Sequence, residues 1–323
     1  MCTFSKVIEK LNSQKFSNKE RGSIFEELIK NYFLKDPKYS VKLENVYLWH
    51  EFPFKRQFSS GQDIGIDLVA KTKSGEYWAI QCKFYSKNNC ITKEDIDTFL
   101  STSSKFFSDG NNEIKFSQRL LISTTDKWSS NAEETIKNQS IPVFRINYID
   151  LENSQIDWPE ELSCKNVIIK RKKPYDTKDH QKEAIQKSIE YFKTHDRGKL
   201  IMACGTGKTF TSLKISEKMA AKNKIICYLV PSIALLSQTL KEWTAQCEIT
   251  IIPICVCSDS NVSRTSEDKN IIDLGYPVTT DPQKVYQEFK EYKYNRSICW
   301  YRNIYCQTYS IWFNKQRKYK EKI

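Results

Sequence analysis

Three polar side chains interrupt two apolar runs near residue 70. Asp67 begins the run DLVA, and Gln81 and Lys83 lie in the run YWAIQCK. Alternate residues of a strand share a face, so Gln81 and Lys83 should point one way while Ile80 and Cys82 pack on the other side. A carboxylate, an amide carbonyl and an ammonium on one strand pair suit a Mg²⁺ ion beside a phosphate, because oxygen ligands hold this cation and the ammonium can orient water. The plain alternative is a solvated strand edge, since D…QxK recurs by chance.

A second group of chemistry-bearing residues is the stretch MACGTGKT, Met202–Thr209. It fits the phosphate-binding pattern GxxxxGK[ST], except that Met202 stands at the first glycine. Two later glycines let the backbone fold round phosphates and aim N–H groups at them. Lys208 would reach the β- and γ-phosphates, and the Thr209 hydroxyl would hold Mg²⁺. The predicted nucleotide-binding residues are Gly205, Thr206, Gly207, Lys208 and Thr209.

The elements that must position the first group alternate between helical and strand patterns, which indicates a compact α/β domain. A Ser-Gly turn in KTKSGE suits a hairpin between the two apolar runs. In chain order we predict a helix over Arg21–Leu34, strands over Ile64–Ala70 and Tyr77–Cys82, a helix capped by Thr92 and Asp95, a strand over Arg119–Thr125, a helix opened by Ser130 and Glu133, and a strand over Pro142–Asn147.

The second half of the chain repeats the alternation around the phosphate loop. Strand, loop, helix, strand, helix, strand is typical of a parallel sheet with covering helices. The predicted elements are a helix over His180–Phe192, a strand over Lys199–Met202, a helix after the loop, a strand over Ile225–Pro231, a helix over Ser232–Gln246 and a strand over Ile249–Asp259.

Composition limits the classes of protein that remain. The chain has 323 residues, enough for two domains, and no apolar run long enough for a membrane span. Its 11 cysteines form no CxxC pair and only three histidines are present, so no zinc-ligand spacing appears and reduced thiols in a cytoplasm are expected. The net charge of +12 favours a polyanionic partner such as nucleic acid over a merely lysine-rich surface.

The second half resembles a known family of motors. From about Tyr175 to Asp281 the chain is similar to the first RecA-like domain of superfamily-two helicases, especially the motors of ATP-dependent restriction enzymes. DHQKEAI resembles the Q-motif helix, whose glutamine reads adenine, and Gln181 is the matching residue. LVPSIALLSQTLKEW, Leu229–Trp243, resembles motif Ia, which lies along the nucleic acid backbone. The resemblance implies ATP as the nucleotide.

The motor resemblance is incomplete. No Asp-Glu pair in the setting of motif II follows Thr209, and no second RecA-like domain with its arginines follows either. From about Asn295 the text shows no clear periodicity, and we interpret it as the product of a truncation or a reading-frame change, with a divergent native segment as the alternative. We expect this chain to bind ATP better than it hydrolyses it.

The first half resembles the Mrr-like branch of the PD-(D/E)xK nucleases over about Phe16–Trp158. The spacing D-x13-QxK, formed by Asp67, Gln81 and Lys83, matches that branch, in which glutamine replaces the first acid of the pair. The surrounding text GIDLVA and YWAIQCKFY extends the match beyond the three polar residues.

The resemblance also implies a fourth site residue. GSIFEELIK, Gly22–Lys30, resembles the leading helix whose glutamate completes the metal site. Glu26 is the matching glutamate, and Glu27 is the neighbour with which it could be confused. The implied metal ligands are Asp67, Glu26 and the Gln81 carbonyl, with Lys83 assisting the attack of water on a phosphodiester.

We therefore expect an α/β chain: a restriction-endonuclease-like α/β domain followed by an incomplete parallel-sheet P-loop RecA-like domain. The expected bounds are residues 1–165 for the Mrr-like endonuclease domain, 166–176 for a basic linker, 177–294 for the first RecA-like domain and 295–323 for an aberrant or truncated tail.

The leading hypothesis is a Mg²⁺-dependent endonuclease acting on double-stranded DNA, with its activity in residues 1–165. Missing helicase, methyltransferase and specificity modules would act with it, and no membrane is involved. Two alternatives remain open: a catalytically inactive DNA-binding remnant, and a DNA repair helicase whose N-terminal domain only binds DNA.

Overall fold

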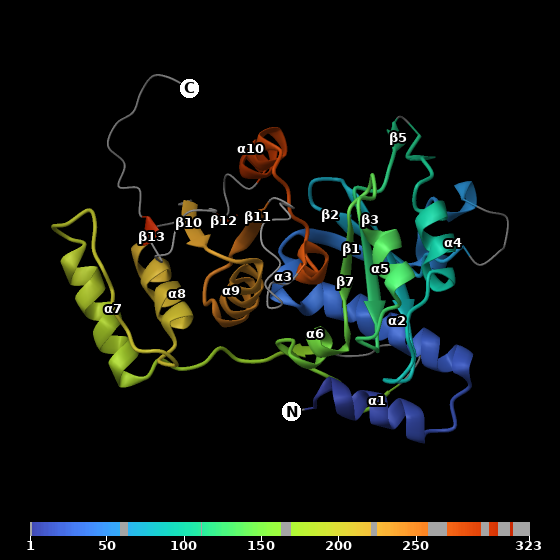
Figure 1. Cartoon of the computed structure of the whole chain (residues 1–323), viewed down its shortest axis with the longest axis horizontal. Coiled ribbons are helices and arrows are strands. Elements are labelled where there is room, and N and C mark those ends of the chain that lie inside the picture. The colour runs from blue at the N-terminus through green and yellow to red at the C-terminus, as the bar shows by residue number, and fades with distance from the viewer. Residues whose placement is uncertain are drawn as a thin grey trace. The chain divides into compact units, whose positions relative to one another are not determined.

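The computed structural model describes residues 2–58, 64–110, 112–162, 169–220, 225–257, 270–291, 297–302 and 311–312. The chain divides into two compact units (Figure 1). The first comprises Met1–Lys172 and Asn270–Pro277, and the second comprises Lys173–Lys269 and Val278–Ile323. The first unit thus contains a segment that the sequence-based boundaries assign to the second domain.

Five strands form the mixed sheet of the first unit, in the order β1-β2-β3-β6-β7. β1, β2 and β3 are antiparallel neighbours, whereas β3, β6 and β7 run parallel. Leu68 pairs with Ile80, which confirms the predicted hairpin. The strands are β1 Leu43–Leu48, β2 Leu68–Thr72, β3 Tyr77–Lys83, β6 Gln118–Ser123 and β7 Val143–Ile146.

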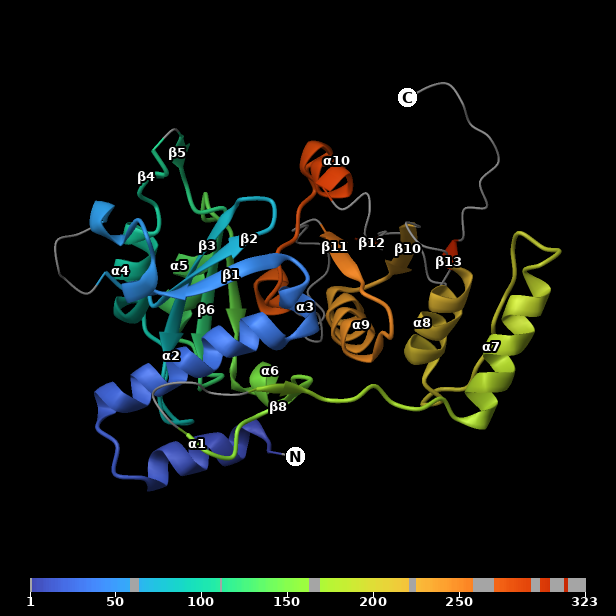
Figure 2. The ribbon, with the colours of Figure 1, turned by 180° about the vertical axis from the view of Figure 1, so that it is seen from behind.

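Helices cover both faces of this sheet. α4 (Glu94–Thr102) and α5 (Ser130–Ile136) pack on the face that carries Val69, Ala79 and Leu121. α2 crosses the other face and contacts β1 and β3 (Figures 1 and 2). The other elements of this unit are α1 Phe4–Ser13, α2 Asn18–Lys35, α3 Pro37–Ser40, η1 Trp49–Glu51, η2 Lys55–Gln57, β4 Phe107–Ser108, β5 Glu113–Ile114, α6 Tyr148–Glu152, β8 Ile156–Asp157, β9 Lys170–Arg171 and η3 Ile271–Leu274.

Two helix caps differ by one residue from those that the sequence indicates, although α5 itself begins at Ser130 as predicted. Ser129, not Ser130, is the N-cap of α5, and its hydroxyl accepts from the Ala132 N–H. Asp95 does bond to Thr92, but α4 begins only at Glu94. The Asp95 carboxylate accepts both the N–H and the hydroxyl of Thr92, at 2.7 and 3.0 Å. Adjacent polar residues compete as caps, so the sequence locates the turn better than the capping residue.

The second unit contains a four-stranded sheet in the order β11-β12-β10-β13. β12 runs parallel to both β10 and β11, and β13 is antiparallel to β10. The start of the expected tail therefore forms a strand, while 303–310 and 313–323 lie outside the described residues. The elements are α7 Asp179–Tyr191, α8 Lys208–Met219, β10 Ile225–Val230, α9 Ile233–Gln246, β11 Ile252–Val256, α10 Pro282–Glu291, β12 Ser297–Arg302 and β13 Ile311–Trp312.

The strand predicted over Lys199–Met202 is wrong. This segment pairs with no strand among the described residues, and the Ile201 side chain is 90% exposed. An apolar run becomes a strand only where a neighbouring backbone supplies hydrogen-bond partners. The expected linker also differs in part, because β9 pairs with β8 and Lys172 Nζ donates to the Ser154 carbonyl at 2.9 Å.

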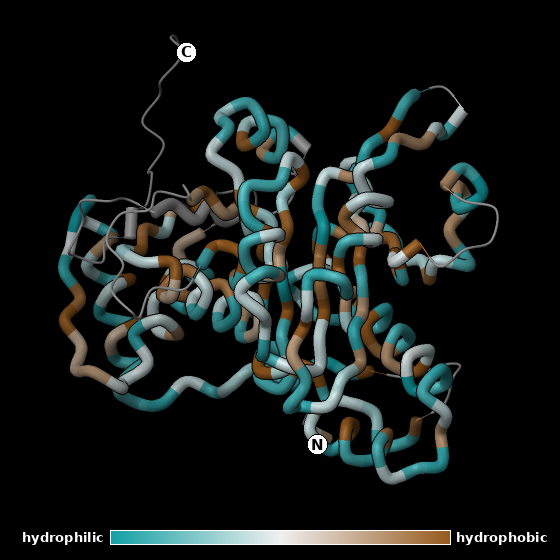
Figure 3. The backbone as a smooth tube through the Cα atoms, turned by 45° about the vertical axis from the view of Figure 1, so that its right-hand side comes forward, coloured by the Kyte–Doolittle hydropathy of each residue, from teal (hydrophilic) through white to brown (hydrophobic). Residues whose placement is uncertain are grey.

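The apolar residues follow the regular elements. Figure 3 shows brown, hydrophobic segments along the strands and teal, hydrophilic segments in many of the connecting loops. None of the described helices is both long and apolar enough to cross a membrane.

One charged side chain is fully buried in the first unit. Arg119 on β6 is 0% exposed, and its guanidinium donates to the hydroxyl of Ser103 at 2.7 Å and to the carbonyl of Leu100 at 2.9 Å. It also donates to Ser104. Burial lowers the pKa of Arg119 to about 10. The arginine therefore satisfies acceptors at the C-terminal end of α4, where helix carbonyls lack partners.

We expect Arg119→Ala to lower the free energy of unfolding of the first unit by about 3 kcal/mol, because buried acceptors lose their donor. The control is Lys137→Ala, which removes an exposed ion pair with Glu134 and should have little effect. Urea denaturation followed by hydrogen exchange in β6 measures both. Equal midpoints for the two variants would contradict a structural role for Arg119.

Candidate active site

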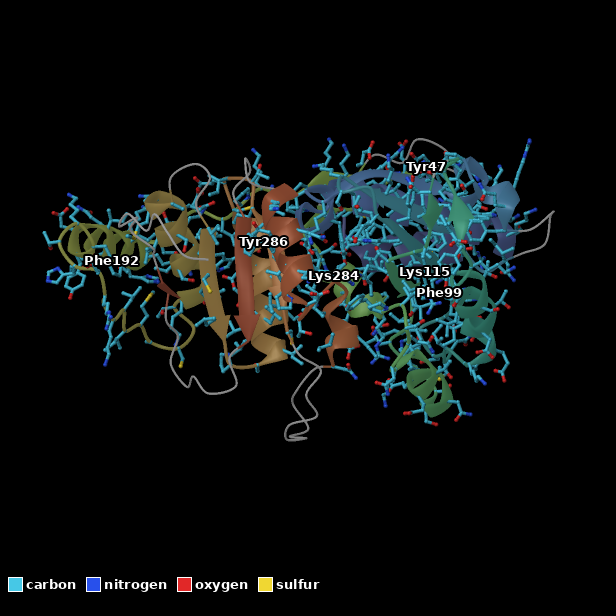
Figure 4. The ribbon with its side chains drawn as sticks, turned by 90° about the horizontal axis from the view of Figure 1, so that it is seen from above. Tyr47, Phe99, Lys115, Phe192, Lys284 and Tyr286 are labelled. Carbon is cyan, nitrogen blue, oxygen red and sulfur yellow. The ribbon has the colours of Figure 1, made fainter. Side chains whose placement is uncertain are left out.

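Gln81 lies buried on the α4 side of the sheet, with 3% of its surface exposed. Among the described residues its carbonyl Oε1 has no hydrogen-bond partner. Gly65 packs against the same side chain: its φ is +72°, and a Cβ there would lie 2.9 Å from the backbone nitrogen of Phe99 and 3.3 Å from Gln81 Nε2. Phe99, on α4, is labelled in Figure 4. A side chain at residue 65 would displace the amide.

Asp67 reaches the backbone beside Gln81. Its own N–H donates to the Ile80 carbonyl at 2.9 Å, which extends the β2–β3 pairing by one residue. Its carboxylate Oδ2 accepts the Cys82 N–H at 2.6 Å. The carboxylate therefore lies next to the peptide that joins Gln81 to Cys82, and the structure brings together these two residues of the predicted site.

Glu26 lies on α2, and its charge affects the same short stretch of β3. Phe25 contacts Phe84 with ring centroids 5.8 Å apart, which holds α2 against the end of β3. Burial raises the pKa of the Cys82 thiol well above its usual value, and the charges of Asp67 and Glu26 raise it further. Glu26 is therefore close enough to the end of β3 for its charge to affect Cys82, and its role as the fourth site residue stays a prediction.

Lys83 ends β3 and is half-buried. Its charge acts on Asp95: burial alone would raise the pKa of Asp95, but hydrogen bonds from Tyr85 and Thr92, together with the Lys83 charge, hold it below its usual value. Burial and the bond to Asp95 raise the pKa of Tyr85 to about 12, so its hydroxyl remains a donor. The sequence analysis missed Tyr85, although it lies two residues beyond Lys83 and could share its face.

The residues around Gln81 fit a hard divalent cation. No group of three or more His, Cys, Asp or Glu side chains able to hold a metal ion occurs in the described part of the chain. The candidate site instead places the Asp67 carboxylate near the amide oxygen of Gln81, with Glu26 on α2 as the further ligand that the sequence predicts. A buried carbonyl without a donor costs about 1–3 kcal/mol, which a bound cation would offset. Oxygen donors of this kind suit Mg²⁺ or Ca²⁺.

The phosphate loop has the predicted backbone. Gly205 and Gly207 have φ angles of +77° and +80°, and α8 begins directly after them at Lys208. Lys208 is exposed, with Nζ 3.5 Å from the Met202 carbonyl. Trp243 on α9 fixes the start of the helix by donating its indole N–H to the Thr209 carbonyl at 3.0 Å. The loop and the helix N-terminus are arranged to receive an anion.

Gln181 contacts the loop itself. Its Oε1 accepts the Lys178 N–H at 2.9 Å, and its Nε2 donates to the Thr206 carbonyl at 3.0 Å. A Cβ at Gly207 would lie 2.5 Å from this Nε2, so the loop needs glycine there to accept the contact. The residue predicted to read adenine thus supports the phosphate loop here, and its adenine contact stays a prediction.

Comparisons with known proteins match a domain family to each half of the chain. Residues 34–167 match the family described as "Restriction endonuclease", and residues 174–297 match "Type III restriction enzyme, res subunit". This chain therefore joins a restriction endonuclease domain to a helicase-like domain. The match to the endonuclease domain begins at residue 34, after Glu26. The prediction for Glu26 therefore rests on its position in α2 and on the effect of its charge on Cys82.

Solved structures also resemble this chain. The ATP-dependent Type ISP restriction-modification enzyme LlaBIII bound to DNA is 35% identical, with a TM-score of 0.75 over 94% of this chain and 18% of that chain. A nuclease-deletion mutant of the Type ISP enzyme LlaGI, in complex with a DNA substrate mimic, is 40% identical over 40% of this chain and 12% of that chain, with a TM-score of 0.33. No curated protein matches. The chain spans 18% of the length of LlaBIII.

The reactivity of the Cys82 thiol depends on whether the Asp67 carboxylate lies beside it. We expect Asp67→Asn to lower the pKa of this thiol, because removing a nearby negative charge favours the thiolate. The alkylation rate of Cys82 at pH 8, followed by mass spectrometry, should therefore rise. Added Mg²⁺ should have the same effect on the unaltered chain.

Cys90 is exposed and serves as the internal control, with an alkylation rate that the substitution leaves unchanged. An unchanged alkylation rate of Cys82 in Asp67→Asn would show that the carboxylate lies elsewhere in solution.

Proposed function

We propose that this chain is a Mg²⁺-dependent endonuclease acting on double-stranded DNA, joined to an ATP-binding helicase-like domain. The observation that carries the proposal is the buried, unpartnered carbonyl of Gln81, beside the Asp67 carboxylate and one residue before Cys82. Such an oxygen is costly in a protein interior unless a cation or donor occupies the site. The restriction endonuclease match over residues 34–167 supports the same reading.

Each residue of the site has a distinct role in phosphodiester hydrolysis. Asp67, Glu26 and the Gln81 carbonyl would hold the cation, which when bound polarises a phosphate oxygen and lowers the pKa of water. The Lys83 ammonium offsets negative charge that develops on the phosphate and orients the attacking water. Asp95 supplies the countercharge that Lys83 faces, and Tyr85 holds Asp95 through its hydroxyl. Gly65 leaves the space that the Gln81 amide needs.

The helicase-like domain would bind ATP and DNA. Its phosphate loop presents backbone N–H groups and Lys208 to the nucleotide, and Thr209 would complete the Mg²⁺ shell. The net charge of +12 suits a phosphate backbone as partner. Because LlaBIII is a restriction-modification enzyme, we propose that methyltransferase and specificity modules act together with this chain. The described cysteines are free thiols, which suits the cytoplasm.

Substitution at the site should separate cutting from folding. We expect Lys83→Ala and Asp67→Ala each to reduce nicking of plasmid DNA at least about 100-fold, because each removes charge stabilisation at the reacting phosphate. Lys73→Ala, at an exposed lysine of the β2–β3 hairpin, is the matched control and should cut normally. Hydrogen exchange in β3 verifies that the variants fold. Full activity in folded Lys83→Ala would overturn the assignment.

The helicase-like domain should bind ATP without DNA-stimulated turnover by this chain on its own. The phosphate loop is in place, but no acidic pair in the setting of motif II follows it, and loss of a transition-state arginine alone costs about 10³–10⁵ in rate. Calorimetry should detect ATP binding that Lys208→Ala abolishes and Lys218→Ala preserves. Rapid DNA-dependent ATP hydrolysis by the purified chain would contradict this expectation.

A further inference from the structure

Arg21 on α2 is a half-buried arginine whose side chain has no partner among the described residues. Its Nε is buried and makes no hydrogen bond there, while its two Nη groups reach the surface and are likewise unpaired. Its backbone N–H donates to the Ser17 carbonyl at 3.0 Å, so only the guanidinium is left over. A buried donor without an acceptor costs free energy, and a charged donor costs more than a neutral one.

The fold satisfies two other arginines of the first unit that are largely or fully buried. Arg119 donates to several acceptors at the end of α4. Arg145, with 13% of its side chain exposed, donates to the carboxylates of Glu133 and Asp273. Acceptors are therefore present where an arginine has a structural role, and none is present for Arg21.

Arg21 continues the buried stripe of α2. Ile24, Phe25 and Leu28 lie three, four and seven residues further along the helix and are 0% exposed. Residues at these spacings share one face of a helix. An apolar residue would suit this position if packing were its only role. An arginine instead packs its apolar stem and carries its charge to the boundary with water.

This stripe meets the end of β3, where the candidate endonuclease site lies. The rings of Phe25 and Phe84 have centroids 5.8 Å apart, and Phe84 directly follows Lys83. Arg21 lies one turn before Phe25, and helical side chains lean towards the N-terminus, away from Glu26. Five residues of helix separate Arg21 from Glu26, about 7.5 Å along the axis. Arg21 therefore lies beside the predicted metal site and outside its set of ligands.

A phosphate of DNA is the ligand that this guanidinium suits. It is anionic, and its oxygens match the planar fork of an arginine in two parallel hydrogen bonds. Contacts of this kind fix the register of a protein on a duplex without reading the bases. A carboxylate of the protein at the same place would compete with the phosphate, which gives a physical reason for leaving the arginine unpaired.

We propose that Arg21 binds a phosphate of the cleaved DNA strand next to the one that is hydrolysed, and so positions the strand at the metal site. This inference rests on the endonuclease function proposed above and adds a substrate contact to it. Arg21 holds the DNA away from the reacting atoms, so it stabilises the bound substrate and the transition state equally. The guanidinium lowers the stability of the free domain and raises its affinity for DNA.

Arg21→Met tests this role, because methionine keeps an unbranched stem and removes the guanidinium. We expect the KM for nicking of plasmid DNA to rise about ten-fold, the effect of losing a hydrogen bond to a charged group, with kcat changed less than about two-fold. Hydrogen exchange in β3 should be no faster, since a buried donor without a partner is removed. Lys19→Ala, at an exposed lysine of the same helix, is the matched control and should leave KM unchanged.

An unchanged KM in Arg21→Met would overturn the phosphate contact. Faster exchange in β3, with a loss of kcat, would show that Arg21 only supports the fold and would also overturn it.

Chemical protection tests the contact without any cutting. The whole 323-residue chain is treated with phenylglyoxal, which modifies arginines, in a chelator and with or without a saturating DNA duplex. Mass spectrometry should show modification of Arg21 slowed about ten-fold by DNA. Arg56, exposed on η2, is the internal reference and should react at the same rate in both samples.

Equal rates at Arg21 with and without DNA, or equal protection of Arg21 and Arg56, would overturn the proposed contact. A chain that never nicks DNA would refute the endonuclease function instead, and protection of Arg21 would still decide whether this residue binds the duplex.

Discussion

β3 is hydrogen-bonded along both edges, and this double pairing decides where the reactive side chains lie. Its pairing with β2 is antiparallel, with Leu68 opposite Ile80, and its pairing with β6 is parallel, with Gln81 opposite Leu121. A slip of one residue would move every side chain to the opposite face. The register therefore places the Gln81 amide in the interior and leaves Lys83 half-buried at the end of the strand.

The endonuclease site contains a buried polar group that destabilises the fold. The Gln81 carbonyl is buried without a partner, and two carboxylates act on the neighbouring Cys82 thiol. The unpartnered carbonyl opposes folding, because a buried lone pair has lost its hydrogen bond to water. A metal ion bound by this oxygen would remove that cost. The residue that weakens the isolated fold therefore indicates its chemistry.

Local signals were sufficient for the hairpin and the phosphate loop, because alternation and glycine placement depend on near neighbours. They failed where burial depends on distant segments. The apolar residues of Lys199–Met202 suggested a strand, yet Ile201 remains 90% exposed. The segment Asn270–Pro277 carries no periodic signal, and the ion pair of its Asp273 with Arg145 joins residues 128 positions apart. Gln181 matched a motif, but its contacts with the Thr206 carbonyl follow from how α7 packs on the loop.

The most direct test of the account is the position of a bound metal ion. Crystals of the chain grown with Mn²⁺, which favours the same oxygen ligands as Mg²⁺, would locate the ion by anomalous scattering. The account predicts one peak within coordination distance of Gln81 Oε1 and the Asp67 carboxylate. A fully occupied ion elsewhere, with Gln81 Oε1 bonded to a protein donor, would contradict it.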